Sequence, residues 1–97
     1  MKQRIRARIV SMDHGLQEYE DIEMIRVKSA HHTLLIMQNY MPLLGELDGY
    51  IEIVFDDHTI RMQNLKGFYM HKKNEFNLLI EKGDTTPIKV VEEEEHV

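Results

Sequence analysis

Apolar and polar residues alternate along most of the chain, which is the pattern of half-buried β-strands. At the N-terminus Ile5, Ala7 and Ile9 alternate with basic residues, which predicts a first strand over residues 3–11. The same alternation, or a short apolar run, predicts further strands at residues 33–37, 50–55, 59–65, 67–71, 76–81 and 87–91. Many short strands joined by turns predict an all-β fold, an antiparallel β-sandwich or flattened barrel of roughly eight to ten short strands.

Turn-forming residues separate the expected strands. Residues 56–58 and 72–75 are expected to be hairpin turns because they are polar and lie between alternating segments. Gly49 follows Asp48 and is expected to form a turn that opens the first of these hairpins. Gly67 is likewise expected at a structural turn before the second hairpin, and each of the five glycines has a turn or bulge explanation.

Residues 16–29 fit two patterns. Apolar residues recur there at helical spacing, and Asp13 could cap a helix. Residues 22–28, however, are rich in β-branched side chains and partly alternate, as a strand would. Periodicity alone leaves both alternatives open.

Composition narrows the possible functions. The 97 residues fit one domain, expected at residues 1–91, followed by an acidic tail at 92–97 that is expected to be disordered. The chain has no cysteine, which excludes disulfides, thiolate metal sites and thiol catalysis. A net charge of −5 argues against general nucleic-acid binding. The longest apolar runs are too short to cross a membrane, so no direct membrane insertion is expected, and no signal peptide is recognisable.

Residues suited to catalysis or metal binding are few. Six histidines are present, but adjacent His31 and His32 would point to opposite faces of a strand, and no zinc-binding signature occurs. The two serines lie outside any nucleophile-elbow motif, and no glycine-rich phosphate loop occurs. We therefore expect a protein that is not an enzyme and that has no cofactor and no metal site.

The segment Asn39-Tyr40-Met41-Pro42 is the candidate site for partner contact. Pro42 and its polar neighbours end the preceding apolar run and predict a loop. An exposed pair of tyrosine and methionine in a loop is typical of a protein-contact patch. Four other methionines fall on expected strands and are expected to fill gaps in the core: Met24, Met37, Met62 and Met70.

Three stretches in this order, residues 35–44, 47–51 and 66–70, together with the apolar strand at 76–81, resemble landmarks of a known family. The family is the epsilon subunit of F-type ATP synthases, in its N-terminal β-sandwich, and the resemblance covers about residues 4–82. It implies that residues 22–28 form a strand. Matching positions are Asn39, Pro42, Leu43, Leu44, Gly49, Gly67 and Phe68. The family's pattern differs at residues 30–33, at Tyr40 and at Lys66, so its polar loop contacts do not carry over there.

The resemblance implies a non-catalytic subunit of the rotating central stalk. Such a subunit couples the gamma subunit to the polar loops of the membrane c-ring during proton- or ion-driven ATP synthesis. It would be cytoplasmic, and peripheral at the inner face of the cell membrane as part of the complex. The family's C-terminal helical hairpin, which carries inhibition of ATP hydrolysis, would be missing from this chain. The alternative is a stand-alone epsilon-like sandwich that acts as an adaptor for other proteins.

Two surfaces are candidates for these contacts. Tyr40, Met41 and Pro42 would supply apolar anchors at the ring end. The basic residues at the N-terminus would either be solvated or pair with an acidic partner surface: Lys2, Arg4, Arg6 and Arg8.

Overall fold

The computed structural model describes residues 4–91, and this part of the chain folds into eight β-strands without a helix. The strands are β1 (Ile5–Ser11), β2 (Gly15–Ile22), β3 (Met24–Ser29), β4 (Thr33–Ile36), β5 (Leu43–Val54), β6 (Thr59–Lys72), β7 (Glu75–Lys82) and β8 (Ile88–Lys89). They form one sheet in the order β2-β1-β7-β6-β5-β3-β4, with β8 paired to β6. The all-β prediction is confirmed, whereas the tail predicted at 92–97 lies outside the described residues.

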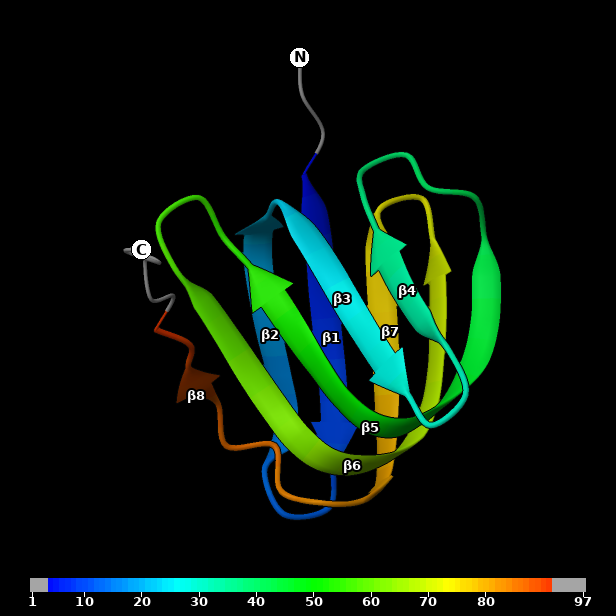
Figure 1. Ribbon diagram of the computed structural model, residues 1–97, viewed down its shortest axis with the longest axis vertical. Coiled ribbons are helices and arrows are strands. Elements are labelled where there is room, and N and C mark those ends of the chain that lie inside the picture. Colours follow the sequence, from blue (N-terminus) through cyan, green and yellow to red (C-terminus); the bar gives the residue numbers. More distant parts are fainter. Residues whose placement is uncertain (1–3, 92–97) are drawn as a thin grey trace, which may run out of the picture.

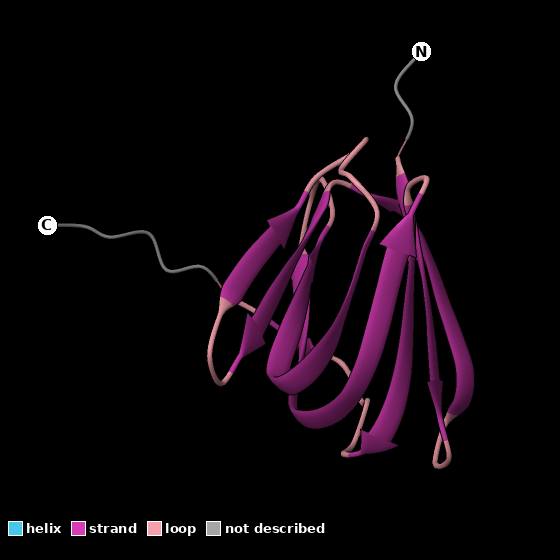
Figure 2. Ribbon diagram, turned by 90° about the vertical axis from the view of Figure 1, so that its right-hand side faces the viewer, coloured by secondary structure: helices cyan, strands magenta, loops and turns pink. Residues whose placement is uncertain are grey.

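Two long strands turn this single sheet into two facing layers. β5 has 12 residues and β6 has 14 residues, and both curve from one layer into the other (Figure 1). One half of the β5–β6 pair continues into β7, β1 and β2, whereas the other half of β5 continues into β3 and β4. The side view shows the resulting sandwich, whose layers splay apart without closing into a barrel (Figure 2).

One strand pair departs from the expected antiparallel arrangement. β1 and β7 pair in parallel, with Ile9 beside Leu78 and Val10 beside Leu79. Parallel neighbours need a long connection between them, because a tight turn always reverses the chain. Here the connection is most of the domain, from β2 to β6, so local sequence patterns held no information about this pairing.

The core lies between the layers and follows the alternation of the sequence. On β1 the side chains of Ile5, Ala7 and Ile9 are buried while the intervening arginines face outward. Strands β1 to β7 all contribute to one hydrophobic cluster, which therefore joins the two layers. Burial of this apolar surface supplies most of the favourable free energy of folding.

Residues 16–29 form two strands rather than a helix. β2 and β3 are separated only by Glu23, and a positive φ of 57° at Asp21 changes the chain direction just before it. Ile25 and Val27 are buried on alternate positions of β3, which agrees with the period of two and with the strand implied by the family resemblance. The helical spacing of the apolar residues was therefore misleading.

Gly49 and Gly67 lie within strands, so the turns predicted at both positions were wrong. Gly49 belongs to β5 and Gly67 to β6, and each sits beside a register shift in the sheet. A Cβ atom at Gly49 would collide with the carbonyl oxygen of Lys28, and one at Gly67 with that of Leu79. Glycine is needed here because neighbouring backbones come unusually close where the long strands bend. The predicted hairpin turns at 56–58 and 72–75, in contrast, are confirmed.

We expect Gly67→Ala to lower the free energy of unfolding by about 1–3 kcal/mol or more, because the added methyl group must displace backbone rather than a flexible side chain. Urea unfolding followed by circular dichroism measures this. Gly15→Asn is the matched control, since Gly15 has open space around it and a φ of 65° that asparagine tolerates. Equal losses in the two variants would contradict the close-approach explanation.

Candidate protein-contact surfaces

An apolar patch covers the outer face of the sheet over β1, β7, β6 and β5. Its members are 42–76% exposed and we call them the outer apolar patch: Val10, Leu44, Phe68, Met70 and Leu79. Val10 pairs with Leu79, Leu79 pairs with Phe68, and Met70 pairs with Leu44, so the five side chains lie in adjacent cross-strand positions. A shallow depression of about 320 Å³ lies among them, and Arg8 and Asn77 also line it.

The outer apolar patch breaks the rule that outward positions of a strand are polar. Scattered exposed apolar residues are normal, but a contiguous group on one face is typical of a surface that another molecule covers. The signal was present in the sequence, because residues 68–70 and 78–80 are apolar on both faces of their strands. The prediction that Met70 belongs to the core was wrong, because Met70 and Met37 are exposed, and of the four methionines predicted in the core only Met62 is fully buried.

The segment predicted for partner contact, residues 39–42, forms the loop between β4 and β5. Asn39 has a positive φ of 63°, and its backbone N–H donates to Oδ1 of Asn74 at 2.7 Å. The side chain of Asn74 returns a hydrogen bond to Oδ1 of Asn39 at 3.3 Å, which ties this loop to the β6–β7 turn. The two turns therefore position each other at one end of the sandwich.

The four predicted contact residues do not form one uniform surface. Met41 is 65% exposed and Pro42 is exposed, whereas Tyr40 is half-buried and packs against the hydrophobic core. The backbone N–H of Tyr40 donates to the carbonyl oxygen of Met37 at 3.2 Å, which closes the turn. Met41 and Pro42 are therefore the accessible residues of this loop, while Tyr40 packs against the core and holds the loop in place. Partner contact at this loop stays a prediction.

The arginines in and just before β1 already have acidic partners within the chain. Arg4 lies 2.7 Å from Asp56, Arg6 lies 2.9 Å from Glu75, and Arg8 lies 3.4 Å from Glu18. Exposed ion pairs contribute little stability, yet they neutralise the charge that a partner would meet. The structure therefore favours solvated, self-paired arginines over a basic partner surface, and Lys2 lies outside the described residues.

A buried carboxylate lies on the outer face of the other layer. Glu52 of β5 is only 5% exposed and lies between Arg26 of β3 and Arg61 of β6 in a cross-strand row. Arg26 Nη1 donates to Glu52 Oε1 at 2.8 Å and Arg61 Nε donates to Oε2 at 2.9 Å. Burial raises the pKa of Glu52, but the hydrogen bonds and charges of the two arginines outweigh burial and hold the pKa below its usual value. The row clamps three strands together with an ionised carboxylate.

His71 is a buried histidine whose ring nitrogens have no hydrogen-bond partner in the described part of the chain. It lies on the inward face of β6, fully buried, with its ring 6.3 Å from that of Phe76. Burial lowers the pKa of His71, because the apolar surroundings disfavour the charged imidazolium. The ring is therefore neutral at physiological pH and acts as a packing group.

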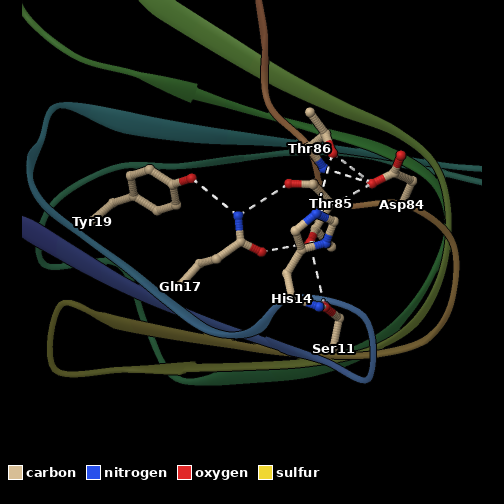
Figure 3. Close-up of polar contacts among 7 residues, drawn as sticks. All are labelled: Ser11, His14, Gln17, Tyr19, Asp84, Thr85 and Thr86. Carbon is tan, nitrogen blue, oxygen red and sulfur yellow. Dashed lines mark hydrogen bonds and ion pairs between the residues drawn. The ribbon is translucent and has the colours of Figure 1, made fainter.

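A polar cluster joins the β1–β2 turn to the loop between β7 and β8 (Figure 3). Thr85 is fully buried at its centre and donates from Oγ1 to Gln17 Oε1 at 2.5 Å. Gln17 Nε2 donates to the carbonyl oxygen of Thr85 at 3.1 Å, and Ser11 Oγ lies 3.4 Å from Thr85 Oγ1. The hydroxyl, amide and carbonyl groups satisfy one another, as buried polar groups must.

This cluster contains histidine, hydroxyl and carboxylate groups but lacks the arrangement of a catalytic triad. A triad needs a carboxylate at one imidazole nitrogen and a nucleophile at the other. Here Asp84 and Thr86 both lie near Nε2 of His14, at 3.9 and 3.3 Å, while Nδ1 faces the buried hydroxyl of Thr85 at 3.3 Å. Thr86 donates its hydroxyl proton to Asp84 at 2.7 Å instead. The cluster therefore fastens a loop and forms no activated nucleophile.

Comparison with known proteins identifies a similar fold. The chain is similar to a chain in the cryo-EM structure of the Tetrahymena thermophila mitochondrial ATP synthase central stalk and c-ring, with a TM-score of 0.64 and 15% sequence identity. The match covers 84% of this chain and 66% of that chain. No protein-family model matches the sequence. No curated protein matches it either.

No helix in the part of the chain that the structure describes is long and apolar enough to cross a membrane.

We expect the two central residues of the 39–42 loop to respond differently to truncation. Tyr40→Ala should lower the free energy of unfolding by about 1–3 kcal/mol, since it removes a half-buried ring packed on the core. Met41→Ala should change it by less than about 0.5 kcal/mol, because Met41 is exposed. Thermal and urea unfolding measure both, and a large loss for Met41→Ala would show that this side chain is not available to a partner.

We expect His71 to lower the free energy of unfolding when the pH is reduced below about 6.5. In the unfolded chain His71 gains a proton near pH 6.5, the ordinary pKa of histidine. In the folded chain burial lowers the pKa of His71, so the ring is protonated only at a lower pH. Unfolding therefore becomes more favourable as the pH falls. The loss has a limiting slope of about 1.4 kcal/mol per pH unit for one proton. His71→Leu should reduce this slope between pH 6.5 and 5 in urea titrations, and His31→Leu, at an exposed site, should leave it unchanged. An identical slope in His71→Leu would show that other groups cause the pH dependence.

Proposed function

We propose that this chain is a non-catalytic subunit of the central stalk of an F-type or F-like ATP synthase. In this role it couples the gamma subunit to the membrane c-ring during proton- or ion-driven ATP synthesis, as a peripheral subunit at the inner face of the cell membrane. The observation that carries the proposal is the shared fold with a chain of an ATP synthase central stalk and c-ring structure, over 84% of this chain. The order of residues that resembles the epsilon subunit supports it independently.

The fold suits a mechanical role. A coupling subunit must transmit torque without deforming, which needs a densely packed core and continuous connections between its layers. The long strands β5 and β6 run through both layers, and the Arg26–Glu52–Arg61 row fastens three strands on one side. A force applied to one layer therefore reaches the other through covalent backbone as well as through side-chain packing.

The outer apolar patch is the surface best suited to a firm partner contact. Phe68, Met70 and Leu79 lie at its centre, and clustered aromatic and aliphatic side chains of this kind carry most of the binding free energy in protein interfaces. We assign the gamma subunit to this patch. The loop with Met41 and Pro42 lies at one end of the sandwich, and we assign the loops of the c-ring to it.

A stand-alone adaptor with the same fold is the alternative function. The positions at which this chain differs from the epsilon pattern, Tyr40 and Lys66 among them, favour it. An adaptor would use the same outer apolar patch for a different partner, so only the identity of the partner separates the two functions.

The test is binding to the gamma subunit from the same organism. We expect the two proteins to co-elute in gel filtration at micromolar concentration, and Phe68→Ala combined with Leu79→Ala to weaken the complex at least about tenfold. Leu35→Ala is the matched control, because Leu35 is similarly exposed but lies on β4, in the other layer and away from the patch.

Two results would contradict the proposal. If gamma subunit and this chain elute separately at micromolar concentration, the stalk role fails and the adaptor remains. If they co-elute but the double variant binds as tightly as the unmodified chain while both melt at the same temperature, the assignment of the gamma subunit to the outer apolar patch is wrong.

A further inference from the structure

β4 is an edge strand with free backbone hydrogen-bonding groups. The strand order ends at β4, so within the described residues one side of this strand has no neighbour. Ser29 donates its N–H to the carbonyl oxygen of His32, which makes this a hydrogen-bonded pair. In an antiparallel pair of strands, every second pair of facing residues is hydrogen-bonded. Thr33, which faces Lys28, and Leu35, which faces Arg26, are therefore in non-bonded pairs with β3. Their N–H and C=O groups point away from β3, toward the free edge.

The two ends of the sheet differ in how they are protected. β2, at the other end, carries Glu18, Glu20 and Asp21, and charged residues are a common way to prevent an edge from pairing with another chain. β4 has the sequence Thr-Leu-Leu-Ile and carries no charge. Its length of four residues limits pairing to a short segment, but nothing in its side chains repels one.

A lysine that is unpaired within the described residues, Lys28, lies next to β4 on the outer face of the sheet. Between Glu23 and Glu46 the chain contains Arg26, Lys28 and two histidines but no acidic residue, although the net charge of the chain is −5. Lys28 is exposed, stands opposite Thr33, and forms no salt bridge in the described part of the chain. Lys28 lies one strand away from an incoming strand, so its long side chain would reach acidic residues there by extending across Thr33.

Apolar side chains complete the site. Leu34 is half-buried and Ile36 is fully buried on the inward face of β4, so a neighbouring strand could extend the core with apolar residues at the same level. An added strand presents alternate residues to the two faces of a sheet. Its inward positions would suit apolar residues, and its outward positions would suit acidic residues within reach of the Lys28 side chain across Thr33.

We propose that the free edge of β4 binds an extended protein segment in which apolar and acidic residues alternate, by adding it as a further strand of the sheet. The backbone groups of Thr33 and Leu35 supply the hydrogen bonds, and Lys28 selects for acidic side chains. The site is separate from the outer apolar patch and does not depend on the stalk role.

A synthetic eight-residue peptide that alternates valine and glutamate is the probe. In NMR spectra of the isotopically labelled protein we expect the peptide to slow hydrogen exchange of the Thr33 and Leu35 amides, which face outward in the free protein. The amides of Leu34 and Ile36 already point toward β3 and should change little. Unchanged exchange at Thr33 and Leu35, or chemical-shift changes confined to the outer apolar patch, would overturn the proposal.

Charge and backbone controls complete the test. Lys28→Glu should weaken binding of the peptide about tenfold, whereas Lys82→Glu, the same charge change at an exposed position on β7, should leave it nearly unchanged. Only every second residue of the peptide would direct its N–H group toward β4. We therefore compare one peptide N-methylated at every valine with one N-methylated at every glutamate. The peptide whose methyl groups block the pairing N–H groups should bind at least about tenfold more weakly than the other. Equal binding by both methylated peptides, or equal effects of the two lysine variants, would show that the peptide does not pair with β4.

Discussion

The structure depends on the bending of two strands. β5 and β6 are long enough to belong to both layers, and each has a position where a neighbouring backbone comes close enough to exclude a side chain. Gly49 and Gly67 occupy these positions beside register shifts in the sheet. Without these bends the eight strands would form an open sheet with one apolar face exposed to water. With them, that face folds onto itself and becomes the core.

Because the core is buried between the two layers, the outer faces of the layers can carry different kinds of side chain. One outer face carries an apolar patch across four strands, and the other carries a buried glutamate held between two arginines. The first arrangement suits a partner, because exposed apolar area gains free energy when it is covered. The second suits rigidity, because its charges are already satisfied within the chain. Both features include residues of β5 and β6, so the same two strands connect the apolar patch to the opposite layer.

The two contact surfaces proposed for this domain use different chemistry. The outer apolar patch offers side chains, and its specificity would come from shape and burial. The edge of β4 offers backbone groups, and its specificity would come from the alternation of side chains on the added strand and from the charge of Lys28. A small sandwich can hold both because faces and edges of a sheet are separate surfaces.

The sequence by itself determined the class of the fold and the direction of most side chains. Alternation with a period of two placed Ile5, Ala7 and Ile9 inside and predicted the hairpin turns at 56–58 and 72–75, because burial of one face is a local property of each strand. Only the tertiary structure decided the parallel pairing of β1 with β7, the strand positions of Gly49 and Gly67, and the half-buried place of Tyr40. These depend on which backbones meet across the sheet, and residues that meet in this way are far apart in the chain. The tertiary structure also decided the outer apolar patch. Its five residues come from four strands and form one surface only when those strands lie side by side.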